Sequence, residues 1–127
     1  MSAHPQPQGN LTLQTISMPA NTNPQGDIFG GWMLSQMDLA GAILALEVAK
    51  GRVTTVAVSS MTFLRPVPVG SLVSCYARLV AIGNTSIRIG IEVWIKNFIT
   101  LDIAKVTEGE FVYVALDEGG HKRSVPK

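Results

Sequence analysis

The chain has 127 residues, the usual length of one domain, and folding can bury about two thirds of the unfolded surface of such a chain. Its 46% apolar and 15% charged residues exclude a disordered chain and favour burial of apolar surface between subunits. The net charge of +1 is too small for a protein whose main partner is a nucleic acid or an anionic membrane. We therefore expect no nucleic acid and no membrane among its partners. The single cysteine excludes an internal disulfide and a cysteine-built zinc site, and it favours a reducing cytoplasm.

The first residues predict a short head followed by one domain. Residues 1–10 are polar, contain two prolines and lack the charged and apolar regions of a signal peptide, so we expect a flexible head before a single domain over residues 11–127. The apolar stretch over residues 28–49 is long enough to cross a bilayer, but Asp38 and Glu47 lie within it. A buried helix of a soluble protein is the better interpretation.

The first half of the chain predicts one strand and one helix. Residues 11–18 alternate apolar and polar side chains, as a half-buried strand does, and this strand ends before Pro19. Residues 21–27 are turn formers without an apolar side chain. Residues 32–49 contain no proline and favour helix, and their apolar side chains cover nearly every face. Such a helix must be enclosed by other parts of the protein.

Everything after the helix predicts strands. We expect four of them, at residues 53–64, 72–82, 86–96 and 104–116, with a tight hairpin at Gly83-Asn84. The fold class is therefore α+β, with a long central helix wrapped by a curved antiparallel sheet of about five strands. The edges of such a sheet favour pairing with a second copy of the chain.

Asp38 is the main candidate for chemistry, because it lies in the middle of the most apolar helix. An ionised carboxylate there loses water unless it is hydrogen-bonded or opens to a cavity. Ser35 precedes it by three residues, and Gly41 and Ala42 follow by three and four, so small residues share its face. They leave space for a ligand or a second backbone. The alternative is a carboxylate that caps a neighbouring loop, with small residues that serve helix–sheet packing, and the sequence leaves both open.

Gly30 and Gly31 stand where the helix begins. Free amides in a first helical turn can stabilise the oxyanion that forms when water attacks a carbonyl carbon. With Asp38 about two turns further on, a base and amide donors could flank one carbonyl, as acyl hydrolysis requires. The alternative is a glycine-rich helix start without a ligand, with Asp27 as an Asx-turn residue.

Other chemistries find little support. His4 and His121 have no second ligand at metal spacing, so no metal is expected, and without a histidine near the core no Ser-His-Asp triad can be assembled. The Walker phosphate loop and the dinucleotide fingerprint are missing from the sequence, and we expect no cofactor. Cys75 is expected to be an inert, buried thiol.

Two neighbouring segments resemble a known family. The sequence NPQGDIFGGW at residues 23–32, followed by SQMD at residues 35–38, resembles the signature of the hotdog-fold acyl-CoA thioesterases of the YciA-type branch. The resemblance covers about residues 12–125, and its further segments are residues 56–58, 61–63, 65–67, 83–87 and 92–96.

This resemblance implies a helix wrapped by an antiparallel sheet, and hydrolysis of acyl-CoA in the cytoplasm without a cofactor. It also implies a homodimer, assembled into a trimer of dimers. The family's catalytic aspartate falls on Asp38 and its oxyanion donors on the amides of Gly30 and Gly31. The substrate-binding positions fall on two groups of residues: Asn23, Asp27, Phe29 and Arg65, and the CoA-phosphate contacts Thr85, Ser86 and Arg88.

Two alternative functions stay open at this point. A hotdog hydratase or dehydratase also acts on acyl thioesters, although its histidine base has no counterpart in the loop or helix. A non-catalytic, oligomeric acyl-CoA-binding module is the other. Within the thioesterase interpretation, Asp38 acts either as a general base or as a nucleophile through a mixed anhydride. Met33, Leu34, Met37 and Phe63 line the acyl tunnel or are plain core residues.

Overall fold

The computed structural model describes residues 6–127. Its strands are β1 (Asn10–Ile16), β2 (Val53–Phe63), β3 (Leu72–Ile82), β4 (Ser86–Lys96) and β5 (Ile103–Ala115), and its long helix is α1 (Gly30–Ala49). A short 3-10 turn, η1 (Pro19–Asn21), follows β1. The predicted helix and strands are all present, with bounds that differ by at most two residues. Half of the head expected at residues 1–10 lies outside the described residues, and β1 already begins at Asn10.

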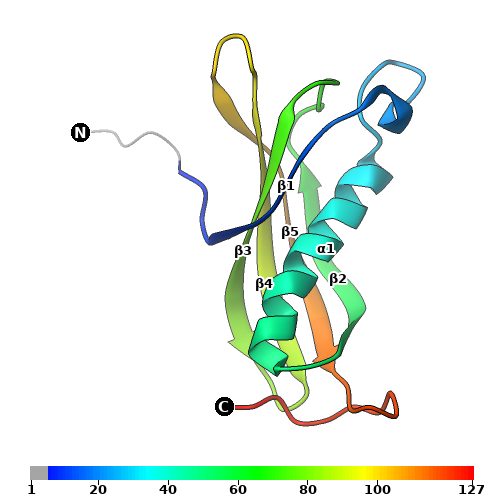
Figure 1. Cartoon of the computed structure of the whole chain (residues 1–127), viewed down its shortest axis with the longest axis vertical. Coiled ribbons are helices and arrows are strands. Elements are labelled where there is room, and N and C mark those ends of the chain that lie inside the picture. Colours follow the sequence, from blue (N-terminus) through cyan, green and yellow to red (C-terminus); the bar gives the residue numbers. More distant parts are fainter. Residues whose placement is uncertain (1–5) are drawn as a thin grey trace.

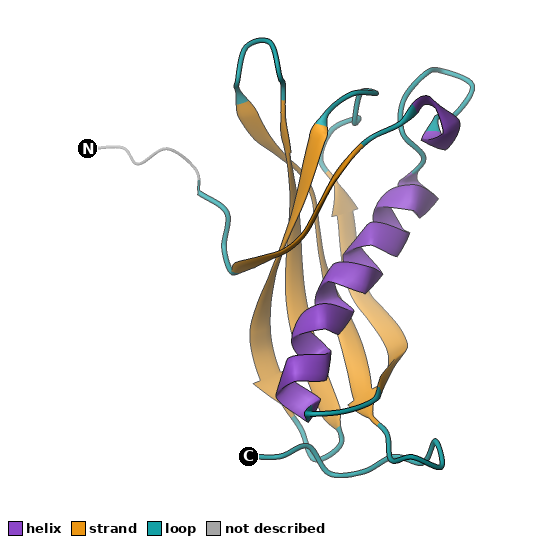
Figure 2. Cartoon of the chain, in the orientation of Figure 1, coloured by secondary structure: helices purple, strands orange, loops and turns teal. Residues whose placement is uncertain are grey.

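The strands form one antiparallel sheet in the order β1-β3-β4-β5-β2. The helix α1 lies along one face of this sheet, as Figures 1 and 2 show. The segment that follows α1 becomes the edge strand β2, whereas β1 forms the opposite edge. The α+β architecture expected from the order of the elements is therefore confirmed.

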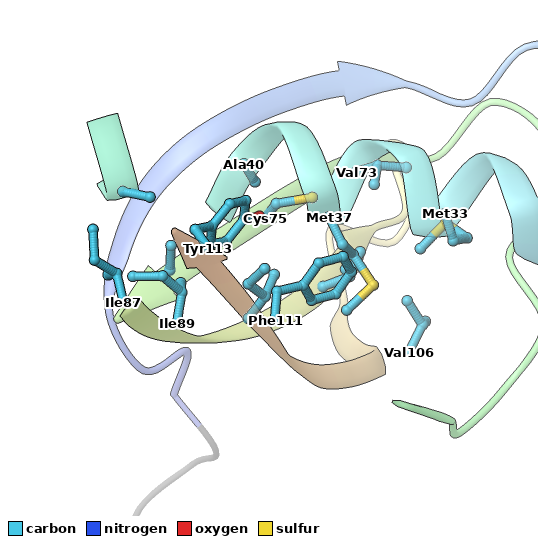
Figure 3. Close-up of a cluster of buried hydrophobic side chains, with 14 of the residues drawn as sticks. Met33, Met37, Ala40, Val73, Cys75, Ile87, Ile89, Val106, Phe111 and Tyr113 are labelled. Atoms are coloured by element: carbon cyan, nitrogen blue, oxygen red, sulfur yellow. The ribbon is translucent and has the colours of Figure 1, made fainter. Parts of the chain in front are cut away.

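The core lies between α1 and the helix-facing side of the sheet. Along β4 the alternating residues Ile87, Ile89, Ile91 and Val93 are buried, as the strict alternation of that strand predicts. Met33 and Met37 of α1 point toward the same layer, where Phe111 and Tyr113 of β5 also lie (Figure 3). The two aromatic rings stack with centroids 6.4 Å apart.

The helix is not enclosed within a single chain, contrary to the expectation. Its sheet-facing side is buried, but three large apolar side chains on the outer side are 36–57% exposed: Leu39, Ile43 and Leu46. The sheet curves along one side of α1 and leaves the other side uncovered (Figure 1). An apolar stripe of this kind on a helix is typical of a surface that another molecule covers.

By length and composition α1 could also cross a membrane, and it is the one helix of that kind among residues 6–127. A single such helix carries little weight, because the core helix of a globular protein passes the same test. Here α1 packs against all five strands, which makes it the core helix of this fold.

Candidate active site

Asp38 is half-buried in the middle of α1, and its carboxylate is held by the neighbouring edge strand. Thr55 of β2 donates a hydrogen bond of 2.6 Å from its Oγ1 to Oδ1 of Asp38. The second carboxylate oxygen, Oδ2, has no hydrogen-bond partner within residues 6–127. Because the partner of Oδ1 is a strand hydroxyl, the alternative that Asp38 caps a neighbouring loop is wrong. The free oxygen can accept a proton from a water molecule.

The small residue at position 41 serves packing. A Cβ on Gly41 would overlap the hydroxyl oxygen of Tyr113 and would come within 2.8 Å of Ile91 Cδ1. That hydroxyl donates a hydrogen bond of 2.7 Å to the backbone carbonyl of Asp38. The expected approach of a ligand or a second backbone to Gly41 is therefore wrong, and the packing alternative is correct. Burial, with the nearby Asp38 carboxylate, raises the pKa of Tyr113, so its hydroxyl stays a donor.

The amides at the start of α1 are open. Phe29 is the N-cap residue, and no side chain caps the first turn, so the amides of Gly30 and Gly31 are free of side-chain partners. The preceding loop is ordered by Asn23, whose Oδ1 accepts hydrogen bonds from the amides of Gln25 and Asp27 at 3.0 and 3.1 Å. Asn23, and not Asp27, is therefore the Asx-turn residue. Since its oxygen is occupied, the Nδ2 group of Asn23 remains as a donor.

A cavity of about 470 Å³ lies beneath this loop and the first turn of the helix. Four of the predicted site residues line it: Asn23, Asp27, Gly30 and Arg65. Its other walls are Ile28, Met33, Phe63, Leu64, Pro66, Val67 and Thr107. Phe29 is 48% exposed and lies outside this lining. The loop and the end of β2 thus bring together residues that are about 40 positions apart in the sequence.

Asp38 does not line this cavity. It follows Gly30 by eight residues, and eight residues of helix span about 12 Å. One carbonyl cannot touch both the Asp38 carboxylate and the amides of Gly30 and Gly31 of the same chain. The structure therefore places the expected base and the expected oxyanion donors apart within one protomer.

The expected phosphate contacts lie at the other end of the sheet. Thr85 and Ser86 stand at the β3–β4 turn, where the carbonyl of Thr85 accepts a hydrogen bond from the amide of Ala115. That turn lies beside the C-terminal end of α1, far from Gly30 (Figure 1). Arg88 forms an ion pair of 2.8 Å with Glu110 of β5. A single chain does not bring these residues to the cavity.

Two residues near Asp38 had no signal in the sequence. Thr55 and Tyr113 lie directly opposite each other in the β2–β5 register, and both reach Asp38. An alternating strand pattern tells which face a side chain occupies, but the pairing of strands 58 residues apart depends on the whole sheet. Within residues 6–127 no group of three or more His, Cys, Asp or Glu side chains is placed to hold a metal ion.

Known proteins are similar to this chain in sequence and in fold. The model of the thioesterase superfamily matches residues 25–97. The acyl-CoA thioester hydrolase YciA of Salmonella typhimurium is 58% identical over 123 residues, which cover 94% of this chain and 92% of that protein. The hexameric thioesterase of Yersinia pestis has 53% identity and a TM-score of 0.91 over 96% of this chain and 99% of that one.

A third similar protein, of lower sequence identity, is described as having a hotdog fold. The hexameric hotdog-fold thioesterase of Campylobacter jejuni is 40% identical, with a TM-score of 0.89, and the match covers 93% of this chain and 91% of that one. The sheet and helix described above are therefore a hotdog fold. With a family model that matches more than half of its length and a relative that matches nearly all of it, this chain belongs to the thioesterase superfamily.

Proposed function

We infer that this chain hydrolyses acyl-CoA thioesters to a free carboxylic acid and CoA, with Asp38 as the group that activates water. The observation that carries the role of Asp38 is its carboxylate geometry: Thr55 fixes one oxygen, and the other has no hydrogen-bond partner within residues 6–127. The names of the close relatives support the substrate class. A hydratase that uses a histidine base has no counterpart for that base here, since the described histidine, His121, lies exposed in the tail beyond β5.

Each step of hydrolysis has a group to perform it. Asp38 takes a proton from water as the water oxygen attacks the thioester carbonyl carbon. The amides of Gly30 and Gly31, with the Nδ2 group of Asn23, donate hydrogen bonds to the oxyanion. Collapse of the tetrahedral intermediate breaks the carbon–sulfur bond, and the proton held by Asp38 passes to the CoA thiolate. Carboxylate, amides and water suffice for these steps, and we propose no cofactor and no metal.

Asp38 could instead attack the carbonyl carbon itself and form a mixed anhydride, which water then cleaves. Label in Asp38 after a single turnover in H₂¹⁸O identifies the anhydride route. Attack of water on the aspartyl carbon of the anhydride leaves the label in Asp38, whereas the general-base route puts it in the fatty acid alone.

The active site is shared between two copies of the chain. Asp38 and Gly30 lie eight residues apart on one helix, and Leu34 is halfway between them. A two-fold axis that crosses two antiparallel helices near Leu34 brings Gly30 of one copy beside the other copy's equivalent of Asp38. Leu34 is exposed and lies on the same row of α1 as Gly30 and Asp38, because residues four apart share a helix face, which supports this arrangement.

The edge strand β2 supports the same dimer. It pairs with β5 on one side only, and nearly all of its residues are exposed, including Val56 and Val58. An open edge with apolar side chains is a place for a second copy to pair. We propose a homodimer built along β2 and α1 and assembled into a trimer of dimers, as the hexameric state of the structural relatives supports. The single thiol, Cys75, fits our proposal that the enzyme works in the cytoplasm.

The catalytic role of Asp38 is tested with Asp38→Asn, which keeps the shape and an oxygen that can accept the Thr55 hydrogen bond. Loss of general-base assistance should lower kcat by about 10²–10⁴-fold with little change in KM. Release of free CoA measures turnover, and Glu47→Gln on the exposed side of the same helix is the matched control. Undiminished turnover in Asp38→Asn would remove this mechanism.

The shared site is tested by mixing two inactive variants. Asn23→Ala lacks the amide donor and Asp38→Asn lacks the base. After the variants are unfolded together and refolded at equal amounts, half of the dimers are mixed, and one of the two sites in each mixed dimer is intact. Activity should return to about a quarter of the wild-type value. A site contained within one chain would regain nothing on mixing.

A further inference from the structure

The hydroxyl of Thr107 is an unpaired polar group in the core. Thr107 of β5 is 0% exposed, and its Oγ1 has no hydrogen-bond partner within residues 6–127. It is the one side-chain oxygen or nitrogen in that range that is buried and unpaired. Leaving such a hydroxyl without a partner is costly, and an orphaned group of this kind calls for an explanation.

Thr107 belongs to the lining of the cavity described above. It stands opposite Phe63 of β2 and Val93 of β4 in the register of the sheet. Directly opposite residues share a face, and Val93 is part of the helix-facing core, so Thr107 projects toward α1. Phe63, at the same level of the sheet, lies 3.3 Å from the position of a Cβ on Gly30.

Burial divides the lining of the cavity into an outer and an inner part. The outer part consists of half-buried and exposed residues: Asn23, Asp27, Gly30, Phe63, Leu64, Arg65 and Pro66. Ile28, Met33 and Val67 are buried and form apolar walls. Thr107 is the fourth buried residue of the lining and the one with a polar side chain. The volume of the cavity, about 470 Å³, falls within the ordinary range of ligand pockets, about 300–1,000 Å³.

The acyl end of the substrate is the part that fits into this cavity. The thioester carbonyl lies at the amides of Gly30 and Gly31 in the proposed reaction, and Gly30 is part of the cavity lining. The CoA end of the substrate carries a large, charged nucleotide, which cannot pass into a buried apolar space. The acyl chain is the end that is small, uncharged and free to terminate in the interior.

We propose that the Thr107 hydroxyl hydrogen-bonds an oxygen carried by the acyl chain, so that this thioesterase favours short acyl groups bearing a hydroxyl or keto oxygen over plain alkanoyl groups of the same length. This inference rests on the proposed function. A threonine hydroxyl both donates and accepts, so it pairs with either kind of oxygen. A plain alkanoyl chain in the same place leaves the hydroxyl unpaired, as it is in the free protein, so this chain gains no hydrogen bond in the ground state or in the transition state.

The test compares butanoyl-CoA with 3-hydroxybutanoyl-CoA, 4-hydroxybutanoyl-CoA and 3-oxobutanoyl-CoA. Wild type is measured beside Thr107→Val, which replaces the hydroxyl by a methyl group of similar size. In Thr107→Val we expect kcat/KM for the best oxygenated substrate to fall by about 10–100-fold, and kcat/KM for butanoyl-CoA to change by less than about threefold. Thr107→Ser, which keeps a hydroxyl, should retain most of the preference. Thr62→Val, on the exposed part of β2, is the matched control.

Two results would overturn the inference. If Thr107→Val changes all four substrates by the same factor, the hydroxyl contacts the CoA portion that they share, or supports only the fold. If it changes none of them, the hydroxyl serves no ligand. Thr107→Ala provides a second hydroxyl-free variant if the valine variant does not fold. Failure of the proposed function is a separate result, because wild type would then release no CoA from any of the four.

Discussion

The Tyr113 hydroxyl donates a hydrogen bond of 2.7 Å to the backbone carbonyl of Asp38. Thr55, directly opposite Tyr113 in the β2–β5 register, donates one of 2.6 Å to the carboxylate of the same residue. Two adjoining strands therefore hold one helical residue, one through its main chain and the other through its side chain. The sheet, and not the helix alone, sets the position of the carboxylate, and this arrangement is how a rigid fold preorganises a reactive group.

Tyr113→Phe should separate the hydrogen bond from the packing of the ring. The ring remains buried, so we expect a loss of about 1–2 kcal/mol in the free energy of unfolding from the missing hydrogen bond. The turn that carries Asp38 loses its anchor, and kcat should fall by about 3–10-fold with little change in KM. Urea unfolding and steady-state kinetics measure the two effects. Tyr76→Phe, on a half-buried tyrosine of β3, is the control, and identical behaviour of the two variants would contradict the anchoring role.

Gly41→Ala should destabilise the protein although alanine is the better helix former. Helix propensity alone would favour alanine by about 1 kcal/mol. The added Cβ would instead overlap the Tyr113 hydroxyl and lie too close to Ile91. We therefore expect the free energy of unfolding to fall by about 1–3 kcal/mol in total. Thermal unfolding measures the change.

The cause can be checked with the double variant Gly41→Ala/Tyr113→Phe, which removes the oxygen that the new Cβ overlaps. The loss in the free energy of unfolding of this double variant should be smaller than the sum of the losses in the two single variants. Strictly additive losses would show that Gly41 and Tyr113 act independently.

Thr55→Val removes the donor to Asp38 Oδ1 and keeps the shape of the side chain. We expect kcat to fall by about 10-fold or more, because the carboxylate loses the bond that fixes its rotamer, while KM changes little. Thr55→Ser should retain much of the activity. The neighbouring Thr54 is exposed on the other face of β2, so Thr54→Val is the matched control. A fall in Thr54→Val equal to that in Thr55→Val would mean that the strand, and not the hydrogen bond, is responsible.

The sequence predicted the elements of the fold well, because their signals are local. The alternation of isoleucines in β4 and the absence of proline from α1 are properties of short windows, and both elements formed where expected. The sequence predicted that α1 is enclosed, but the single chain leaves the outer side of α1 uncovered. Apolar composition tells that Leu39 and Ile43 favour burial, but it cannot tell whether the covering surface comes from the same chain or from another.

The site was predictable only in part, for a related reason. The loop over residues 21–29 and Arg65 could be grouped with Gly30 from the resemblance, and four of the predicted site residues, Asn23, Asp27, Gly30 and Arg65, do share a cavity. Thr55 and Tyr113 could not be found, since their contact with Asp38 depends on the register of two strands. The gap between Asp38 and Gly30 along α1 follows from helix rise, about 1.5 Å per residue, and could have been read as a sign of a second protomer.

Cys75 should be unreactive in the folded protein. Its thiol should also make the stability of the protein fall at high pH. Burial raises the pKa of this thiol to about 12, against an ordinary value of 9.0. Between these values the unfolded chain releases the thiol proton and the folded chain keeps it, so the free energy of unfolding falls as the pH rises above about 9. One group contributes a slope of at most about 1.4 kcal/mol per pH unit. Comparison of urea unfolding of wild type and Cys75→Ala between pH 9 and 10.5 isolates this slope, since Tyr113 and every other group titrate in both proteins. A thiol reagent at pH 8 should label Cys75 only after unfolding, and rapid labelling of the folded protein, or equal slopes in the two proteins, would show that the thiol is not shielded as its burial implies.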